Sequence, residues 1–370
     1  MLSGMIHSTD FRIDLMYSGL MGTARNELLC SKGNQMRTVL SMLIVCGLFA
    51  GITAMARAGE AKASPEGWHS GVGMSSLEDP YKAGEEAART AKMALGGVDA
   101  KMVVVAAAIG LTRAEVVEGV ASQFSKDIIY GCQVASPLTV YGNYPDFQTI
   151  DSPLGVAVWA LGGDIEVTAG VQATDPDAED PYYEAGVALG EYFKPLFEKS
   201  SRPGNIMITF GDQYNGANKD FASGLNDGLE EIYPIIGAAA GNITAKVIVK
   251  GEIVTGVNVG LLLSGDFKLG MAMNGGTHTP ETADKTLKEA LAQGDDEDPF
   301  FALIFNCRRR RQGMIDSKQL GEEHMRIKEN LPNIDFFGFY GPGEIGKEKN
   351  GEKSRGVGFT VVTAVFFPVK

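Results

Sequence analysis

The chain has 370 residues, of which 44% are hydrophobic and 47 are glycine, and it carries a formal net charge of −13. This composition is typical of a globular α/β protein of two or three domains, and it excludes a disordered or fibrous chain. The acidic balance argues against nucleic acids and anionic membranes as partners, because both are bound through basic surfaces.

Residues 1–58 are predicted to be an upstream extension followed by a secretory signal peptide. Met36 and Arg37 precede the apolar run TVLSMLIVCGLFAGITAMA, which ends in small-x-small cleavage patterns. We expect the chain to start at Met36 and the mature protein to begin near Gly59, in the periplasm or outside the cell, without stable membrane insertion. The alternative is an N-terminal membrane anchor, since 19 uncharged residues reach the lower limit for crossing a bilayer.

Three sequence-related units follow this leader. Prolines that stand directly after an N-cap residue recur 101 and 99 residues apart, at Pro80, Pro181 and Pro280. Proline is favoured at the first position of a helix, and the apolar residues after each proline recur at helical spacing. We place the repeats at residues 59–174, 175–277 and 278–370.

Each unit also contains two short, continuously apolar runs, which predict strands covered on both faces. The first of these runs lies at 102–108, 206–210 and 300–305, and in each unit a second helix separates it from the next run. A strand, a helix and a strand in succession form a right-handed parallel pair. The predicted fold is therefore α/β, with three α-β-α-β-β-β units that form mixed parallel and antiparallel sheets with helices packed on them.

Polar residues follow these strands in the second and third units. Because ligands of such sheets bind beyond the carboxyl ends of the strands, these residues are the candidates for a site. GDQYNG and AAAGN follow the two strands of the second unit, and NCRRRR and FYGPGEIG follow those of the third. The candidates are Asp212, Asn215 and Asn242 in the second unit and Cys307, Arg308, Arg310, Tyr340, Gly343 and Glu344 in the third.

Two of these segments carry a family resemblance. FALIFNCRRRRQGM and NIDFFGFYGPGEIG resemble the C-terminal half of FIST-domain proteins, where Cys-x-x-Arg precedes Gly-Phe-Tyr…Gly-Glu-Ile. IIYGC and PIIGAAAGN are similar to the FIST N-terminal region, so the resemblance covers residues 70–368, FIST N-like in the first unit and FIST C-like in the third. It implies a sensory module that binds small ligands such as amino acids, here in a free-standing, exported version.

Arg310 and Glu344 are interpreted as the two halves of a site for a zwitterion. A planar guanidinium matches a carboxylate, and Glu344 would accept from an ammonium group. The alternatives are that Arg308–Arg311 form a solvated loop and that Glu344 only caps a turn among glycines.

Cys307 supports a different class of function, a hydrolase or transferase of small amides or esters. The neighbouring arginines would lower the pKa of a nucleophilic thiol, and Glu344 would serve as its base. A buried structural cysteine is the alternative. Pairing of Cys307 with Cys132 in an oxidising compartment stays open.

We expect no cofactor and no metal. His69, His278 and His324 lie far apart in the sequence and lack metal-ligand spacing. His324 falls on the apolar face of a predicted helix, so we expect it in the core. The expected partner is a small, amino-acid-like molecule.

Overall fold

The computed structural model describes residues 67–140, 155–213, 216–241, 245–295 and 297–369. The predicted signal peptide and the proposed start at Met36 lie outside these residues. None of the helices in the described ranges is long and apolar enough to cross a membrane.

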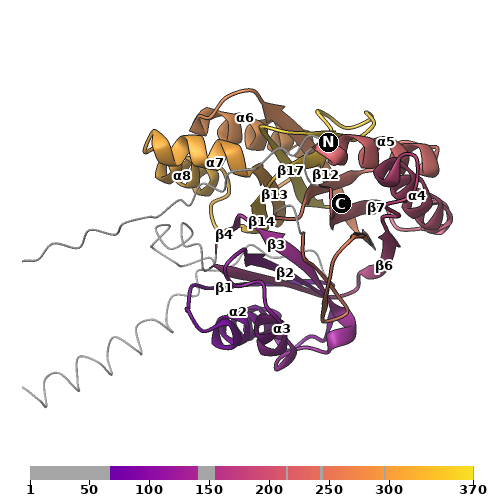
Figure 1. The fold of residues 1–370 in the computed structure, drawn as a ribbon. Helices are drawn as coiled ribbons and strands as arrows, with labels where there is room; N and C mark the ends of the chain where they lie inside the picture. The colour runs from indigo at the N-terminus through magenta and orange to yellow at the C-terminus, as the bar shows by residue number, and fades with distance from the viewer. Residues whose placement is uncertain (1–66, 141–154, 214–215, 242–244, 296, 370) are drawn as a thin grey trace, which may run out of the picture. The chain divides into compact units, whose positions relative to one another are not determined.

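Three consecutive units share one order of elements (Figure 1). The first unit consists of β1 (Trp68–Ser75), α2 (Pro80–Ala94), β2 (Ala100–Ala108), α3 (Ala114–Ala121), β3 (Ile129–Val134), β4 (Ser136–Val140) and β5 (Val156–Gly163). The second consists of β6 (Glu166–Ala173), α4 (Pro181–Lys199), β7 (Gly204–Gly211), α5 (Ala217–Leu229), β8 (Ile235–Ala239), β9 (Val247–Val249), β10 (Glu252–Val254) and β11 (Val257–Gly265).

The third unit repeats this order and adds one helix directly after its central strand. It consists of β12 (Phe267–Gly275), α6 (Pro280–Leu291), β13 (Phe301–Cys307), α7 (Arg308–Asp316), α8 (Leu320–Asn330), β14 (Asp335–Gly341), β15 (Glu344–Gly346), β16 (Arg355–Val357) and β17 (Thr360–Pro368). Each unit thus opens with a strand that precedes the proline-initiated helix. Of these opening strands, β6 lies within the predicted first repeat but pairs in the second sheet, and β12 lies within the predicted second repeat but pairs in the third sheet.

The predicted prolines begin helices α2, α4 and α6. Asp79 caps α2 by accepting a hydrogen bond from the Lys82 amide at 3.0 Å. Asp180 does the same for the Tyr183 amide at 3.3 Å. These side chains satisfy amide groups that have no partner inside the helix, which fixes where each helix starts.

The predicted parallel pairs are confirmed in all three units, as β2 with β3, β7 with β8 and β13 with β14. The last long strand of each unit returns antiparallel beside the first member of its pair. The mixed sheets have the orders β1-β5-β2-β3-β9-β10, β16-β15-β8-β7-β11-β6 and β12-β17-β13-β14-β4. The α/β prediction with mixed sheets is therefore correct.

The short strands are exchanged among the units. β4 of the first unit pairs with β14 of the third, β9 of the second with β3 of the first, and β15 of the third with β8 of the second. Each unit thus completes the sheet of another, and the exchange closes on itself. As a consequence, β15 and β16 belong to the sheet of the second unit, although they are encoded in the third.

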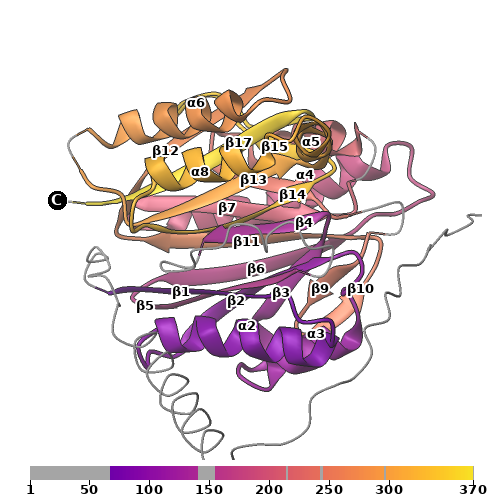
Figure 2. The ribbon, with the colours of Figure 1, turned by 90° about the vertical axis from the view of Figure 1, so that its left-hand side faces the viewer.

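The inner faces of the three sheets meet in one shared core, where Trp159 from the first sheet stacks on Phe301 from the third with ring centroids 4.9 Å apart. Helices cover the outer faces: α2 and α3 on the first sheet, α4 and α5 on the second, α6 and α8 on the third. Figure 2 shows α2 and α3 lying along the first sheet. Burial on both faces explains the unbroken apolar runs of the central strands.

Candidate functional site

A pocket of about 240 Å³ lies where β13 and β14 end, at the edge of the sheet predicted to bind ligands. Its walls come from the second and third units. They include Asn218, Cys307, Arg308, Arg309, Pro342 and Phe359. The strand exchange brings these residues together, because β15 carries the chain from β14 into the neighbouring sheet.

Glu344 is the first residue of β15 and is fully buried. Its neighbour Ile345 packs in the core under α4 and α5, so alternation along the strand directs Glu344 to the opposite face. Oε2 of Glu344 accepts from the hydroxyl of Thr360 at 2.7 Å and from its amide at 3.2 Å. The other oxygen, Oε1, is buried, and no described residue donates a hydrogen bond to it. One carboxyl oxygen of Glu344 is therefore a buried hydrogen-bond acceptor that a ligand could use.

Burial is the main influence on the Glu344 carboxyl and raises its pKa to about 8, although hydrogen bonds from Thr360 and the adjacent Cys307 thiol oppose the shift. A carboxyl with this pKa is mostly protonated at neutral pH. The interpretation of Glu344 as a water-exposed cap of a turn is therefore wrong, since the side chain has no contact with solvent.

Cys307 ends β13, lines the pocket and is 2% exposed. It stands at the N-cap position of α7, where amide groups point out of the helix end. Burial raises the pKa of its thiol, the Glu344 carboxylate raises it further, and the backbone amides of Arg309, Phe359 and Arg310 oppose the shift. Cys307 and Cys132 are both buried free thiols, not a disulfide.

Asn218 joins the helix α5 to the exchanged strands. Its Nδ2 donates to the backbone oxygens of Glu344 at 3.0 Å and Val357 at 2.7 Å. A Cβ on Gly343 would lie 2.8 Å from this Nδ2, which explains why glycine stands there. Gly343 thus permits the approach of Asn218 that fixes the position of Glu344.

Two arginines at the start of α7 form a positive wall of the pocket. Arg308 donates from Nη1 to the backbone oxygen of Gly241 at 3.3 Å. The Arg309 side chain is exposed, and its guanidinium lies 5.4 Å from the ring centroid of Phe359. Phe359 has a left-handed backbone, with φ of 61°, unusual for a bulky residue, which marks a constrained position at the pocket.

Arg310 is placed differently from its neighbours. It is fully buried and forms an ion pair with Glu323 at 2.9 Å. It also donates to the Asn306 side chain at 2.5 Å, to Thr277 O at 2.9 Å and to Thr279 O at 2.8 Å. The interpretation of Arg308–Arg311 as a solvated loop is thus wrong, because these residues open α7 and the third of them is in the core. The guanidinium of Arg310 is engaged with protein groups, and Arg310 is not among the residues that line the pocket.

Tyr340 belongs to the same buried network. Its hydroxyl donates to Glu323 Oε1 at 2.9 Å and lies 3.0 Å from His324 Nε2. Burial lowers the pKa of His324 to about 3, with a smaller contribution from Arg311. The expectation that His324 packs in the core is confirmed.

Of the second-unit candidates, only Asp212 lies in the described residues, and it does not line this pocket. Asp212 follows β7, where burial raises its pKa, and it is not a lining residue. Asn215 and Asn242 lie outside the described residues. Of the nine predicted positions, Cys307 and Arg308 line the pocket. Gly343 and Glu344 do not line it, but both contact Asn218, which does.

Residues at the site that were not among the predicted positions include Arg309, Asn218, Phe359 and Thr360. Arg309 looks like the three arginines beside it, and nothing in the local sequence of Asn218, Phe359 and Thr360 marks them as site residues. These last three reach the site because α5 and the start of β17 pack against β15. Asn218 and Glu344, for example, are 126 residues apart in the sequence.

Comparison with known proteins identifies one family. The FIST N domain model matches residues 101–282, a range that includes Asn218 and ends before Cys307 and Glu344. Similar solved structures include cyanuric acid hydrolase from A. caulinodans, which is 8% identical, with a TM-score of 0.47 over 82% of this chain and all of that one. No curated protein matches the sequence. The chain therefore contains a FIST N domain.

Proposed function

We propose that this chain is an extracytoplasmic sensory protein that binds a small zwitterion of the amino-acid type in the pocket beside Cys307. The observation that carries the proposal is the fully buried Oε1 of Glu344, which has no hydrogen-bond partner in the described part of the chain. The Glu344 carboxyl lies beside Cys307, a residue that lines the pocket with the positive wall. A buried acceptor without a partner costs free energy, and a ligand that donates to it recovers that cost.

The two ends of the ligand are recognised by different groups. The ammonium donates to Oε1 of Glu344, and its charge favours the ionised carboxylate. The carboxylate is held by the guanidinium of Arg309, assisted by Arg308, since a guanidinium fork matches two carboxylate oxygens. Arg309 replaces Arg310 in this role, because Arg310 is already paired with Glu323.

The test is a binding survey of the standard amino acids by native mass spectrometry and thermal shift, followed by titration of the best ligand. Glu344→Gln should weaken that ligand about tenfold or more, because it removes the charge that holds the ammonium. Glu329→Gln, at an exposed position of α8, should leave the affinity unchanged. Equal affinities of the wild type and Glu344→Gln would refute the site.

Export rests on the sequence of residues 36–58 alone. N-terminal sequencing of the protein recovered from its producing cells should find a mature start near Gly59. A retained leader in the membrane fraction would favour the anchor instead.

The position of Cys307 favours a second candidate function, a thiol hydrolase of small amides or esters. Its sulfur faces backbone amides at the start of α7, a geometry that stabilises an oxyanion. In the reaction, Glu344 would take the thiol proton, the sulfur would attack the carbonyl carbon, and the leaving amine or alcohol would receive the proton. Water would then hydrolyse the thioester. Loss of a measurable turnover in Cys307→Ser would support this function, and absence of turnover in the wild type across amide and ester panels would exclude it.

A further inference from the structure

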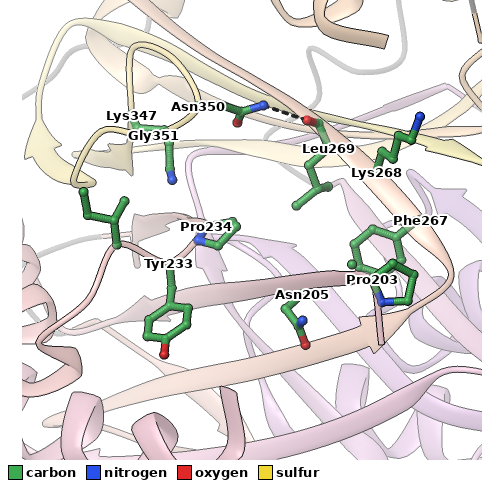
Figure 3. A pocket seen from close by; sticks show the side chains of 12 residues that line it. Pro203, Asn205, Tyr233, Pro234, Phe267, Lys268, Leu269, Lys347, Asn350 and Gly351 are labelled. Atoms are coloured by element: carbon green, nitrogen blue, oxygen red, sulfur yellow. Dashed lines mark hydrogen bonds between the residues drawn. The ribbon is translucent and has the colours of Figure 1, made fainter. Parts of the chain in front are cut away.

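A second pocket, of about 420 Å³, lies beyond the other end of β15 (Figure 3). It is bounded by the start of β7, by Tyr233 and Pro234 before β8, by the first residues of β12, and by the loop after β15. It shares no lining residue with the pocket beside Cys307. Neither proposed function uses it.

Lys347 follows β15 directly and lines this pocket, although it is only 2% exposed. Among the described residues, its amino group makes no hydrogen bond and no ion pair. Burial lowers the pKa of Lys347 to about 8, and the weaker opposing influence is Glu352, which is itself ion-paired with Lys349 at 3.4 Å. The amine is therefore mostly charged at neutral pH, and a buried cation is costly unless an anion accompanies it.

The other polar groups around the pocket already have partners. The Lys268 ammonium pairs with Glu297 at 3.0 Å. Nδ2 of Asn350 donates to the Leu269 carbonyl at 2.8 Å, the dashed contact in Figure 3. The rest of the wall includes apolar surface from Tyr233, Pro234 and Leu269. The pocket thus offers one unsatisfied cation beside an apolar wall.

We propose that this pocket is a second ligand site, which takes a small carboxylate with an apolar body and holds its charged end on Lys347. The ionised carboxylate supplies the missing counter-charge through a charge-assisted hydrogen bond. The apolar body packs against Tyr233, Pro234 and Leu269, which removes apolar surface from water. A volume of about 420 Å³ falls within the range of small-molecule sites and exceeds the needs of an inorganic ion.

The experiment compares benzoate with benzamide, which has nearly the same shape and no charge, by isothermal titration calorimetry at pH 7. The wild type should bind benzoate saturably, and it should bind benzamide at least about tenfold more weakly. Lys347→Met should lose this preference and weaken benzoate binding about tenfold to a hundredfold. Lys347→Arg keeps the cation and should retain most of the affinity.

Two controls separate this site from other charges. Lys349→Met removes an exposed lysine of the same loop and should bind benzoate like the wild type. Glu344→Gln alters the first pocket and should also leave benzoate binding unchanged. Equal benzoate affinity in the wild type and a folded Lys347→Met, or no saturable binding to the folded wild type, would overturn the proposal.

Discussion

Thr360 donates two hydrogen bonds to one carboxyl oxygen of Glu344 and none to the other. Its hydroxyl and its amide both donate to Oε2, at 2.7 and 3.2 Å, while the buried Oε1 has no hydrogen-bond partner within the ranges that the structure describes. The two residues start β17 and β15, which belong to different sheets. The carboxyl is therefore fixed in position but incompletely satisfied, which is the condition that a ligand can relieve.

The first prediction concerns stability against pH. The pKa of Glu344 is raised above its unfolded value, so its contribution to stability is fully present below pH 4.5 and is lost as pH rises through about 8. Glu344→Gln stays neutral and avoids that loss. Between pH 5 and pH 9, the wild type should lose roughly 3–5 kcal/mol more unfolding free energy than the variant. Urea denaturation at both pH values measures the difference. An equal change of unfolding free energy in the wild type and in Glu344→Gln would contradict the raised pKa.

The second prediction separates a structural arginine from a ligand-binding one. Arg310→Met leaves Glu323 buried without its ion-pair partner, so unfolding free energy should fall by about 3–5 kcal/mol. Replacing both members, as Arg310→Met with Glu323→Leu, should recover part of that loss. Arg326→Met, which breaks only partly exposed ion pairs, should cost about 1 kcal/mol or less. If Arg310→Met kept wild-type stability but lost ligand binding, Arg310 would be a ligand-binding residue and not a structural one.

The third prediction tests the contact between Gly343 and Asn218. Gly343→Ala places a methyl group about 2.8 Å from Nδ2 of Asn218, so that side chain must move and lose its bonds to Glu344 and Val357. We expect a loss of about 1–3 kcal/mol in unfolding free energy and weaker ligand binding. Gly321→Ala is the matched control.

Gly321 lies in α8, and a Cβ there meets no atom within 4 Å. This substitution should stabilise the protein by up to about 1 kcal/mol, since alanine favours helices over glycine. If Gly343→Ala behaved like Gly321→Ala in thermal denaturation, the proposed packing of Asn218 against Gly343 would be wrong.

The fourth prediction concerns thiol reactivity. Burial and the neighbouring Glu344 carboxylate raise the pKa of Cys307, so the reactive thiolate is scarce at neutral pH. In a Cys132→Ser background, iodoacetamide should alkylate Cys307 of the folded protein more slowly than Cys307 of the urea-unfolded chain. Alkylation faster than in the unfolded chain would favour the thiol hydrolase over the binding protein.

The long elements could be predicted from the sequence because their signals are local. An N-cap, a proline and helical spacing specify α2, and unbroken apolar runs specify the parallel pairs. The exchanged strands could not be predicted in the same way. β15 has three residues, too few for any periodic pattern, and its partner β8 lies in another unit.

The same limit applies to the site. Glycines and a carboxylate after a strand were enough to mark Glu344, because the strand end is set by local pattern. Four consecutive arginines, however, look alike in the sequence. Only the turn from β13 into α7 brings Arg310 back to Asn306, four residues earlier in the strand, where it can also reach Glu323. Separating Arg310 from Arg309 thus required the tertiary packing of α8.

The most direct test of the proposed site is proton release on ligand binding. Glu344 is mostly protonated in the free protein at pH 7, and an ammonium donating to it should ionise it. Calorimetric titration of the best amino-acid ligand in phosphate and in Tris, whose ionisation enthalpies differ, should show about one proton released by the wild type and none by Glu344→Gln. Equal proton release in both proteins, or tight binding without any, would contradict a ligand site built on Glu344.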